Sequence, residues 1–242
     1  MSIIRLHVTA EGQTEQAFVK SVLSPHLARF NIFADARAVL TSKDKKAHVE
    51  YRGGLLSYQK AKADIVTWIK EDHQAECRFT TMFDFYALPT DFPGYAEAAE
   101  KKDPYDKIKL LEEALYTDIN DRRFIPYIQL HEFEALILAA PGELDWEYLE
   151  HDTPIANLCA MVGTQNPELI NDGAETAPSK RILKQIPEYE KVTAGVSVAG
   201  KIGIETLRAK CRHFSEWLTK LEIKGIPNVK HCLTGAGLRE LI

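Results

Sequence analysis

Strand-like and helix-like segments alternate through the first 139 residues of the chain. Apolar or β-branched runs are separated by stretches whose apolar residues recur at helical spacing. The predicted strands begin at Ile3 and continue as residues 33–40, 78–86 and 124–129. This β–α–β–α–β–α–β order predicts an α/β, Rossmann-like fold, in which a mainly parallel four-stranded sheet with right-handed crossovers is flanked by helices.

Local signals place some of these elements more closely. The near-continuous apolar run of residues 78–86 suits a strand covered on both faces, as in parallel sheets. Pro126 favours the sheet edge for the fourth strand, because proline has no N–H to donate to a neighbour. Asp103 followed by Pro104 predicts the start of the preceding helix.

From about residue 140 onward the signals are mostly helical. Helices are expected near Ile155–Met161, from Ser179, and as one long segment around Ile204–Leu221. We therefore divide the chain into an α/β core, residues 1–140, and a helical C-terminal extension, residues 141–242, packed on the core.

The composition of the 242 residues, 45% hydrophobic and 27% charged, is ordinary for a soluble globular protein. No apolar run approaches the roughly 18 residues needed to span a bilayer, and the N-terminus lacks a signal pattern, so we expect a cytoplasmic protein without membrane contact. A net charge of −5 argues against coating nucleic acid through bulk charge, so any such contact needs local basic clusters. The cysteines form no CxxC pair, which favours buried free thiols over zinc or disulfides; they are Cys77, Cys159, Cys211 and Cys232.

Acidic residues follow three of the four predicted strands. Because the carboxyl ends of parallel strands meet at one edge, where open α/β sheets bind ligands, these acids are expected to converge. Gly12 lets the chain turn after the first strand, and one acid falls in the first turn of the next helix, where the helix dipole favours it. The acids are Glu11, Glu15, Asp84, Asp91, Glu132 and Glu134.

Converging carboxylates repel one another unless a cation neutralises them or some of them are protonated. Oxygen ligands with few imidazoles favour Mg²⁺ or Mn²⁺ over zinc. Such an ion polarises a phosphoryl oxygen and activates water, so the pattern indicates phosphoryl chemistry.

Two other catalytic motifs fail at single positions. His131-Glu132 is not a metalloprotease H-E-x-x-H, because Ala135 stands where the second histidine is required. A helix is expected from His131 to Leu138, and the His131 side chain is left either as its cap or as the partner of a backbone carbonyl. Asp84 invites comparison with aspartyl phosphatases of the D-x-D type, but Tyr86 occupies the place of the second acid.

Two basic segments are candidate phosphate contacts. Residues 41–57, which include Lys43, Lys45 and Arg52, are either a solvated loop or a loop that contacts phosphate. At the predicted helix start at Ser179, Lys180 and Arg181 are either surface cations or groups that neutralise charge on a scissile phosphate.

Four short strings carry a family resemblance: EGQTE, FDFYALPTDFPG, HEFEALI and ETAPSKR, in this order along nearly the whole chain. The first resembles the opening motif of the Toprim (topoisomerase–primase) superfamily. Together they resemble a bacterial Toprim-like family of domain-of-unknown-function proteins, related to the OLD (overcoming lysogenization defect) nucleases.

The resemblance implies roles for individual residues. Glu11 matches the Toprim glutamate, a metal ligand or acid/base group, and Glu15 matches an acid of the OLD-type nucleases. Asp84 matches the first aspartate of the Toprim D-x-D, whose second position is Tyr86 here, and Asp91 is the candidate to compensate. Glu134 resembles a later acid of the nuclease pattern, with Glu132 as the less favoured choice.

The leading hypothesis is a Mg²⁺- or Mn²⁺-dependent phosphodiesterase, a nuclease acting on DNA or RNA. Its catalytic residues would be Glu11, Asp84 and Lys180. The resemblance implies a bacterial anti-phage or mobile-element setting with an ABC- or SMC-like ATPase partner, and a homo-oligomer is left open. The competing hypothesis is a non-catalytic Toprim-fold binding module, and a small-molecule phosphohydrolase is a third.

Overall fold

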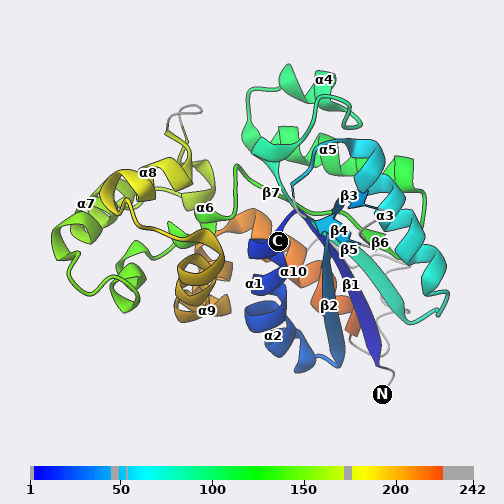
Figure 1. The fold of residues 1–242 in the computed structure, drawn as a ribbon, viewed down its shortest axis with the longest axis horizontal. Helices are drawn as coiled ribbons and strands as arrows, with labels where there is room; N and C mark the ends of the chain where they lie inside the picture. The colour runs from blue at the N-terminus through cyan, green and yellow to red at the C-terminus, as the bar shows by residue number, and fades with distance from the viewer. Residues whose placement is uncertain (1–2, 45–48, 53, 172–175, 226–242) are drawn as a thin grey trace, which may run out of the picture.

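The computed structural model describes residues 3–44, 49–52, 54–171 and 176–225. In this part of the chain the centre is a five-stranded parallel sheet with the order β2-β1-β5-β6, and β7 pairs with β5 beyond β6 (Figure 1). Its strands are β1 (Ile4–Ala10), β2 (Ile32–Ala38), β5 (Cys77–Asp84), β6 (Phe124–Ile125) and β7 (Ile128–Gln129). The predicted α/β fold is confirmed, and it is consistent with a Toprim-like arrangement.

The strand predicted at residues 124–129 is split into β6 and β7, with Pro126 between them. Both segments pair with β5 alone, so they form the sheet edge that the proline indicated.

The order of the strands creates a switch point beside β1. The chain leaves β1 for β2 on one side and then crosses to β5 on the other, so that Val8 pairs with Ala36 and with Thr80. Open α/β sheets leave a crevice at such a point, outside the carboxyl ends of the strands. Glu11 and Asp84, which stand at the ends of β1 and β5, are thereby brought to the same place.

Helices cover both faces of the sheet (Figure 1). Leu6 and Val8 of β1 belong to one apolar cluster, and Phe79 and Phe83 of β5 belong to another. The first cluster includes side chains of α1 (Gln13–Phe18), the π-helical turn η1 (Val19–Leu23), α2 (Ser24–Ala28) and α10 (Arg212–Gly225). The second includes side chains of α3 (Tyr58–Glu71), α4 (Tyr95–Ala99) and α5 (Pro104–Ile119). As predicted, Asp103 starts α5, because its carboxylate accepts the N–H groups of Tyr105 and Asp106.

The chain after the sheet is mostly helical, as predicted, and lies beside the sheet in Figure 1 before α10 returns to it. Trp217 of α10 is buried, and its Nε1 donates to Thr80 Oγ1 of β5 at 3.0 Å. The intervening elements are α6 (Glu134–Ile137), η3 (Pro141–Trp146), α7 (Asp152–Val162), η4 (Pro167–Leu169), α8 (Pro178–Gln185), η6 (Lys191–Gly195) and α9 (Val196–Lys210). The division into a core of residues 1–140 and an extension of residues 141–242 stays a prediction.

Two predicted helices differ from the structure. The long helix around residues 204–221 is divided between α9 and α10 by extended backbone at Cys211 (φ −113°, ψ 95°). There the buried carboxylate of Glu168 accepts the N–H groups of His213 and Phe214 at 2.8 and 3.0 Å, so a distant residue starts the second helix. The helix expected from His131 begins only at Glu134, because His131 has a left-handed backbone (φ 63°).

Residues 41–57, predicted to be a loop, contribute to a hairpin instead. Strands β3 (Leu40–Asp44) and β4 (Val49–Arg52) pair antiparallel, with Lys43 opposite Glu50. Lys45 lies outside the described residues, as do the side chains of Lys43 and Arg52. Their proposed contact with phosphate therefore stays a prediction.

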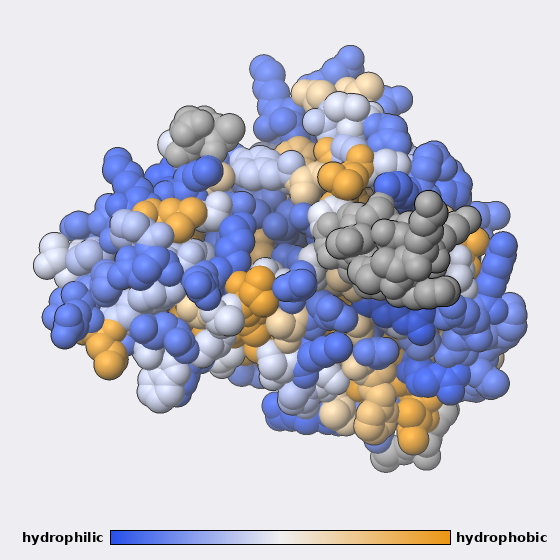
Figure 2. Space-filling view, viewed as in Figure 1, coloured by the Kyte–Doolittle hydropathy of each residue, from blue (hydrophilic) through white to orange (hydrophobic). Residues whose placement is uncertain are grey.

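Large hydrophobic side chains are exposed at scattered positions of the described residues, among them Phe33, Leu56 and Trp146. On the face seen in Figure 2, hydrophobic residues form small separate patches among hydrophilic ones. None of the helices in the described residues has the length and apolar character required to cross a bilayer. Cys77 and Cys211 are buried free thiols as expected, whereas Cys159 is free and exposed, and Cys232 lies outside the described residues.

Candidate functional site

Glu11 continues the backbone pairing of β1 with β5 one residue past Ala10, where the strand ends. Its backbone N–H donates to Met82 O at 2.9 Å, which keeps the main chain paired with β5. Its carboxylate Oε2 accepts the backbone N–H of Asp84 at 2.9 Å. The Glu11 carboxylate therefore lies against the end of β5, across the switch point of the sheet.

Glu15 is held beside this turn by the start of α1. Gly12 is the N-cap residue, and its N–H donates to Glu15 Oε2 at 2.9 Å. The backbone of Gly12 is extended (φ −146°), so the turn does not need the conformational freedom that the sequence suggested. A Cβ at this position would lie 3.4 Å from Glu15 Oε2, at van der Waals contact, so a side chain there would pack directly against the buried carboxylate.

Asp84, the last residue of β5, is buried. Its Oδ1 has no hydrogen-bond partner among the described residues. Burial raises the pKa of the Asp84 carboxyl well above its usual range, and the charges of Glu11 and Glu15 raise it further. A buried carboxylate oxygen without a partner is unfavourable, so a cation at this place would lower the free energy of the ionised group.

Glu132 and Glu134 reach the same site from the segment around α6. Glu134 is fully buried, and its Oε2 accepts a hydrogen bond from Lys191 Nζ at 2.9 Å. Glu132 lies 3.5 Å from the same nitrogen through Oε2, and its Oε1 accepts the N–H of Ser179 at 2.5 Å. The structure thus brings both glutamates to one lysine, including the one that the sequence disfavoured.

Lys191, which begins η6, is the functional residue that the sequence reasoning missed. Its charge acts on Glu11, Glu15 and Asp84 in addition to the two glutamates that it contacts. Burial lowers the pKa of Lys191, but the charges of Glu134 and Glu132 outweigh this and raise it above its usual range, so the amine stays protonated. No local pattern marks this lysine, because its contact with Glu134 joins residues 57 positions apart.

The carboxyl groups of the site share an excess of negative charge. Burial first, and then the charge of Glu15, raise the pKa of Glu11 to about 7. Burial also raises the pKa of Glu134 to about 7, although Lys191 opposes the shift, and it raises the pKa of Glu15. Near pH 7 both the protonated and the ionised forms of Glu11 and Glu134 are therefore populated, which suits a general acid or base.

The site offers oxygen donors to a cation, but the described residues do not form a completed set of metal ligands. Among the described residues, no three His, Cys, Asp or Glu side chains stand ready to hold a metal ion. Oxygens of Glu11 and Glu15 are engaged by backbone N–H groups, and Glu134 is engaged by Lys191. The all-oxygen donors, the unpartnered Asp84 Oδ1 and the excess negative charge nevertheless fit a hard divalent ion. The residues that would hold it are Glu11, Glu15, Asp84 and Glu134.

Tyr86 and His131 stand beside these acids. Tyr86, in the second position of the D-x-D pattern, is 41% exposed. Burial and the charge of Glu132 raise its pKa to about 12, so the phenol is neutral at pH 7 and does not replace a carboxylate ligand. His131 neither caps α6 nor extends it. Its backbone O accepts the Tyr86 N–H at 3.0 Å, and burial lowers the pKa of its imidazole to about 4.

The remaining predicted site residues make other contacts. Asp91 is exposed, and its Oδ1 accepts the N–H of Tyr58 at the start of α3 (3.1 Å). Lys180 is exposed on α8, and the first-turn N–H of that helix, from Ser179, is already bound by Glu132. Arg181 Nε donates to Thr176 O at 2.7 Å. The roles predicted for Asp91, Lys180 and Arg181 stay predictions; within the described part of the chain, Lys191 is a cation in contact with Glu132 and Glu134.

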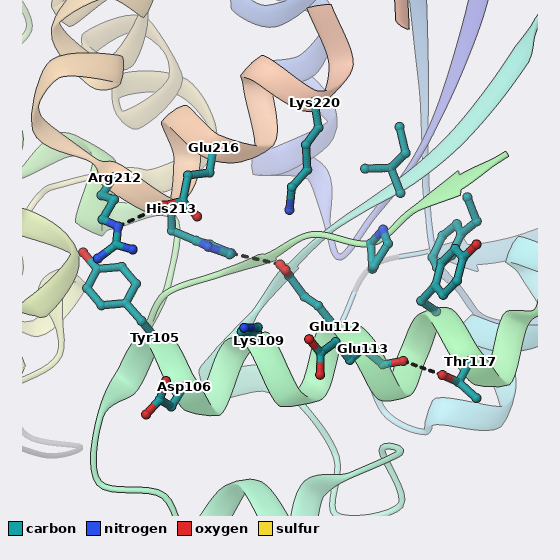
Figure 3. Close-up of a pocket in the computed structure, with 14 residues that line it drawn as sticks. Tyr105, Asp106, Lys109, Glu112, Glu113, Thr117, Arg212, His213, Glu216 and Lys220 are labelled. Atoms are coloured by element: carbon teal, nitrogen blue, oxygen red, sulfur yellow. Dashed lines mark hydrogen bonds and ion pairs between the residues drawn. The ribbon is translucent and has the colours of Figure 1, made fainter. Parts of the chain in front are cut away.

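A separate pocket of about 680 Å³ opens between α5 and α10 (Figure 3). Glu112 reaches His213 there at 2.9 Å, and it also accepts the N–H of Ile128 in β7. These buried groups hold α10 against the sheet. None of the acids described above lines this pocket, so it is distinct from the candidate site.

Comparison with known proteins gives a family and a set of distant structures. The model of the family described as Domain of unknown function (DUF4276) matches residues 10–222. No protein with curated annotation matches the chain.

Two similar solved structures are C-terminal regions of OLD proteins. That from Burkholderia pseudomallei has a TM-score of 0.46 and 16% sequence identity, with 93% of this chain and 100% of that chain covered. That from Xanthomonas campestris pv. campestris has a TM-score of 0.38 and 14% identity, with 91% and 98% covered. These scores are too low to transfer an activity, so the function has to be inferred from the residues of the site.

Proposed function

The chain belongs to the family described as Domain of unknown function (DUF4276), and from its own residues we propose that it is a divalent-metal-dependent phosphodiester hydrolase, a nuclease acting on DNA or RNA. The observation that carries this proposal is the placing of Glu11 against Asp84 at the switch point of the sheet, with Lys191 in contact with Glu134 and Glu132. Such a site presents oxygen ligands for a cation and a fixed positive charge for a phosphate.

The pattern of burial supports a catalytic role over a structural one. A buried carboxylate with a raised pKa destabilises the folded protein when it ionises. Here Glu11, Glu15, Asp84 and Glu134 all have raised pKa values in one place. Perturbed groups that cluster at the ligand-binding edge of a sheet are typical of functional sites.

Each residue has a chemical task in this proposal. A bound Mg²⁺ or Mn²⁺ would supply Lewis-acid polarisation of the phosphodiester and activation of water. Glu11, with a pKa of about 7, is placed to take or return a proton. Lys191 Nζ, held by Glu134 and Glu132, would stabilise negative charge on the phosphoryl oxygens, the task that the sequence assigned to Lys180.

The setting implied by the sequence resemblance belongs to the same proposal. It is an effector of bacterial anti-phage or mobile-element defence in the cytoplasm, acting with an ABC- or SMC-like ATPase. The partner would control access to the substrate or activation of the nuclease.

The proposal is tested with plasmid, single-stranded DNA and RNA, each incubated with the purified protein in Mn²⁺, Mg²⁺ or EDTA. We expect cleavage that EDTA abolishes and that Glu11→Gln and Asp84→Asn each reduce by about 100-fold or more. The matched control is Glu113→Gln, which changes an exposed acid of α5 and should leave cleavage unchanged. Cleavage that persists in both site variants would refute the assignment.

One observation favours a second candidate, a non-catalytic binding module. Tyr86 leaves the site without the second aspartate, and in the described part of the chain the ligands are not gathered into a finished metal site. On this alternative the protein binds nucleic acid without cleaving it, even with its ATPase partner and metal present. The cleavage assay with the partner added separates the two.

A further inference from the structure

Tyr86 is an exposed aromatic ring at the edge of a buried acidic site. It follows β5 in the short 3-10 turn η2 (Phe85–Ala87), two residues after Asp84. The side chain is 41% exposed, whereas Asp84 and His131 on either side are 8% and 6% exposed. Tyr86 is therefore open to solvent beside two buried residues of the site.

The Tyr86 ring is held in place by a backbone hydrogen bond and by neighbouring aromatic rings. The backbone N–H of Tyr86 donates to His131 O at 3.0 Å, which ties η2 to the segment leading into α6. The His131 ring lies 5.2 Å from the Tyr86 ring, centroid to centroid, and the Phe85 ring lies 6.0 Å away. His131 is itself buried, with a left-handed backbone that few non-glycine residues adopt. The exposed ring is thus supported by a neighbouring aromatic group and held in a defined orientation.

The chemistry around the ring suits a nucleotide. Aromatic side chains bind unpaired bases by stacking, without regard to sequence, because every base has a π face. Tyr86 follows Asp84 by two residues, and its N–H is bonded to the carbonyl of His131, the neighbour of Glu132, so the ring is close to the acids that would face the phosphodiester.

We propose that Tyr86 is a stacking platform for one unpaired base of a single-stranded nucleic acid, which it holds beside the acids and Lys191. A base within a duplex is already stacked on its neighbours, so the platform selects single strands or frayed ends. This inference deepens the proposed function and rests on it for the class of substrate. Tyr86, which stands in place of the second aspartate, would then position the substrate, while the acids take part in phosphodiester hydrolysis.

Binding without cleavage provides the test. Fluorescence anisotropy in EDTA measures the Kd of labelled 12-nucleotide single strands of DNA and RNA, and of the matching duplexes, at one fixed salt concentration. Tyr86→Leu should raise the Kd for single strands by about 5- to 100-fold, because it removes the stacking face. Tyr86→Phe and Tyr86→Trp keep that face and should bind within about twofold of the wild type. Duplexes should bind more weakly, and Tyr86→Leu should change their Kd little.

Tyr116→Leu is the matched control, since Tyr116 is a similarly exposed tyrosine (44%) on α5. It should leave the Kd unchanged, and thermal melts should show every variant folded. Equal Kd values for wild type and Tyr86→Leu, or equal losses from the Tyr116 and Tyr86 variants, would overturn the inference.

The two proposals fail in different ways. Binding that depends on Tyr86, without any metal-dependent cleavage, would refute the nuclease and leave the platform standing. Cleavage that depends on Glu11 and Asp84, with binding indifferent to Tyr86, would refute the platform alone.

Discussion

Replacing Glu11 by glutamine should change how the stability of the protein depends on pH. Glutamine keeps an oxygen that can accept the Asp84 N–H, now bonded at 2.9 Å, but it cannot ionise. In the folded protein, burial and the charge of Glu15 raise the pKa of Glu11 from 4.5 to about 7. The variant therefore isolates the free energy of placing this one charge in the site.

The sign follows from the two pKa values. Between pH 4.5 and about 7 the folded protein keeps a proton on Glu11 that the unfolded chain has lost. The stabilisation from this proton is complete below pH 4.5 and is lost as the pH rises through about 7. A shift of this size corresponds to at most about 3.5 kcal/mol, at about 1.4 kcal/mol per pKa unit. Because Glu11 titrates together with Glu15 and Asp84, one substitution removes only part of this free energy. We therefore expect the variant's stability to change by about 2 kcal/mol relative to the wild type between pH 5 and pH 8.

The assay is urea denaturation at pH 5, 6, 7 and 8 in EDTA, for wild type and Glu11→Gln. The free energy of unfolding of the variant should rise relative to the wild type by about 2 kcal/mol from pH 5 to pH 8. Glu113→Gln, at an exposed position, should show a constant difference from the wild type. A constant difference for Glu11→Gln as well would refute the burial of this carboxylate among like charges.

Two further substitutions test the cation and the anchoring of α10. Lys191→Met should reduce the cleavage rate by about 100-fold or more, because it removes the charge that contacts Glu134 and Glu132. Lys191→Arg keeps the charge and should retain part of the rate. Steady-state cleavage rates in Mn²⁺ measure both effects. Glu168→Gln should lower the free energy of unfolding by about 1–3 kcal/mol, because the buried carboxylate accepts the first N–H groups of α10. Chemical denaturation at pH 7 measures this change. An unchanged midpoint would contradict the capping role.

The parts of the fold predicted from sequence were those encoded by local pattern. Apolar runs and helical spacing located the parallel sheet, and Pro126 located its edge, because these signals act within a few residues. The hairpin of β3 and β4 was missed because its polar, lysine-rich sequence resembles a loop. The break between α9 and α10 was missed because Glu168, which caps the second helix, lies 45 residues before His213.

In the candidate site, too, residues marked by local pattern were predictable and residues brought in by long-range contacts were not. The acids at the ends of β1 and β5 were predictable, because a parallel sheet brings the carboxyl ends of its strands to one edge. Lys191 was not, because nothing near it in sequence distinguishes it from a surface lysine, and only the folding of the C-terminal helices brings it to Glu134. Lys180, chosen for its place at a helix start, is exposed, and Glu132 occupies the first N–H group of that helix.

The central claim is that acids from separate strands form one divalent-metal site, and its most direct test is a calorimetric titration of the purified protein with Mn²⁺. If these acids form a metal site, the wild type and Glu113→Gln should both bind Mn²⁺ saturably. Asp84→Asn, which alters the buried carboxylate with the unpartnered Oδ1, should weaken binding by at least about tenfold. Equal binding by all three proteins, or no binding by the wild type, would contradict the claim.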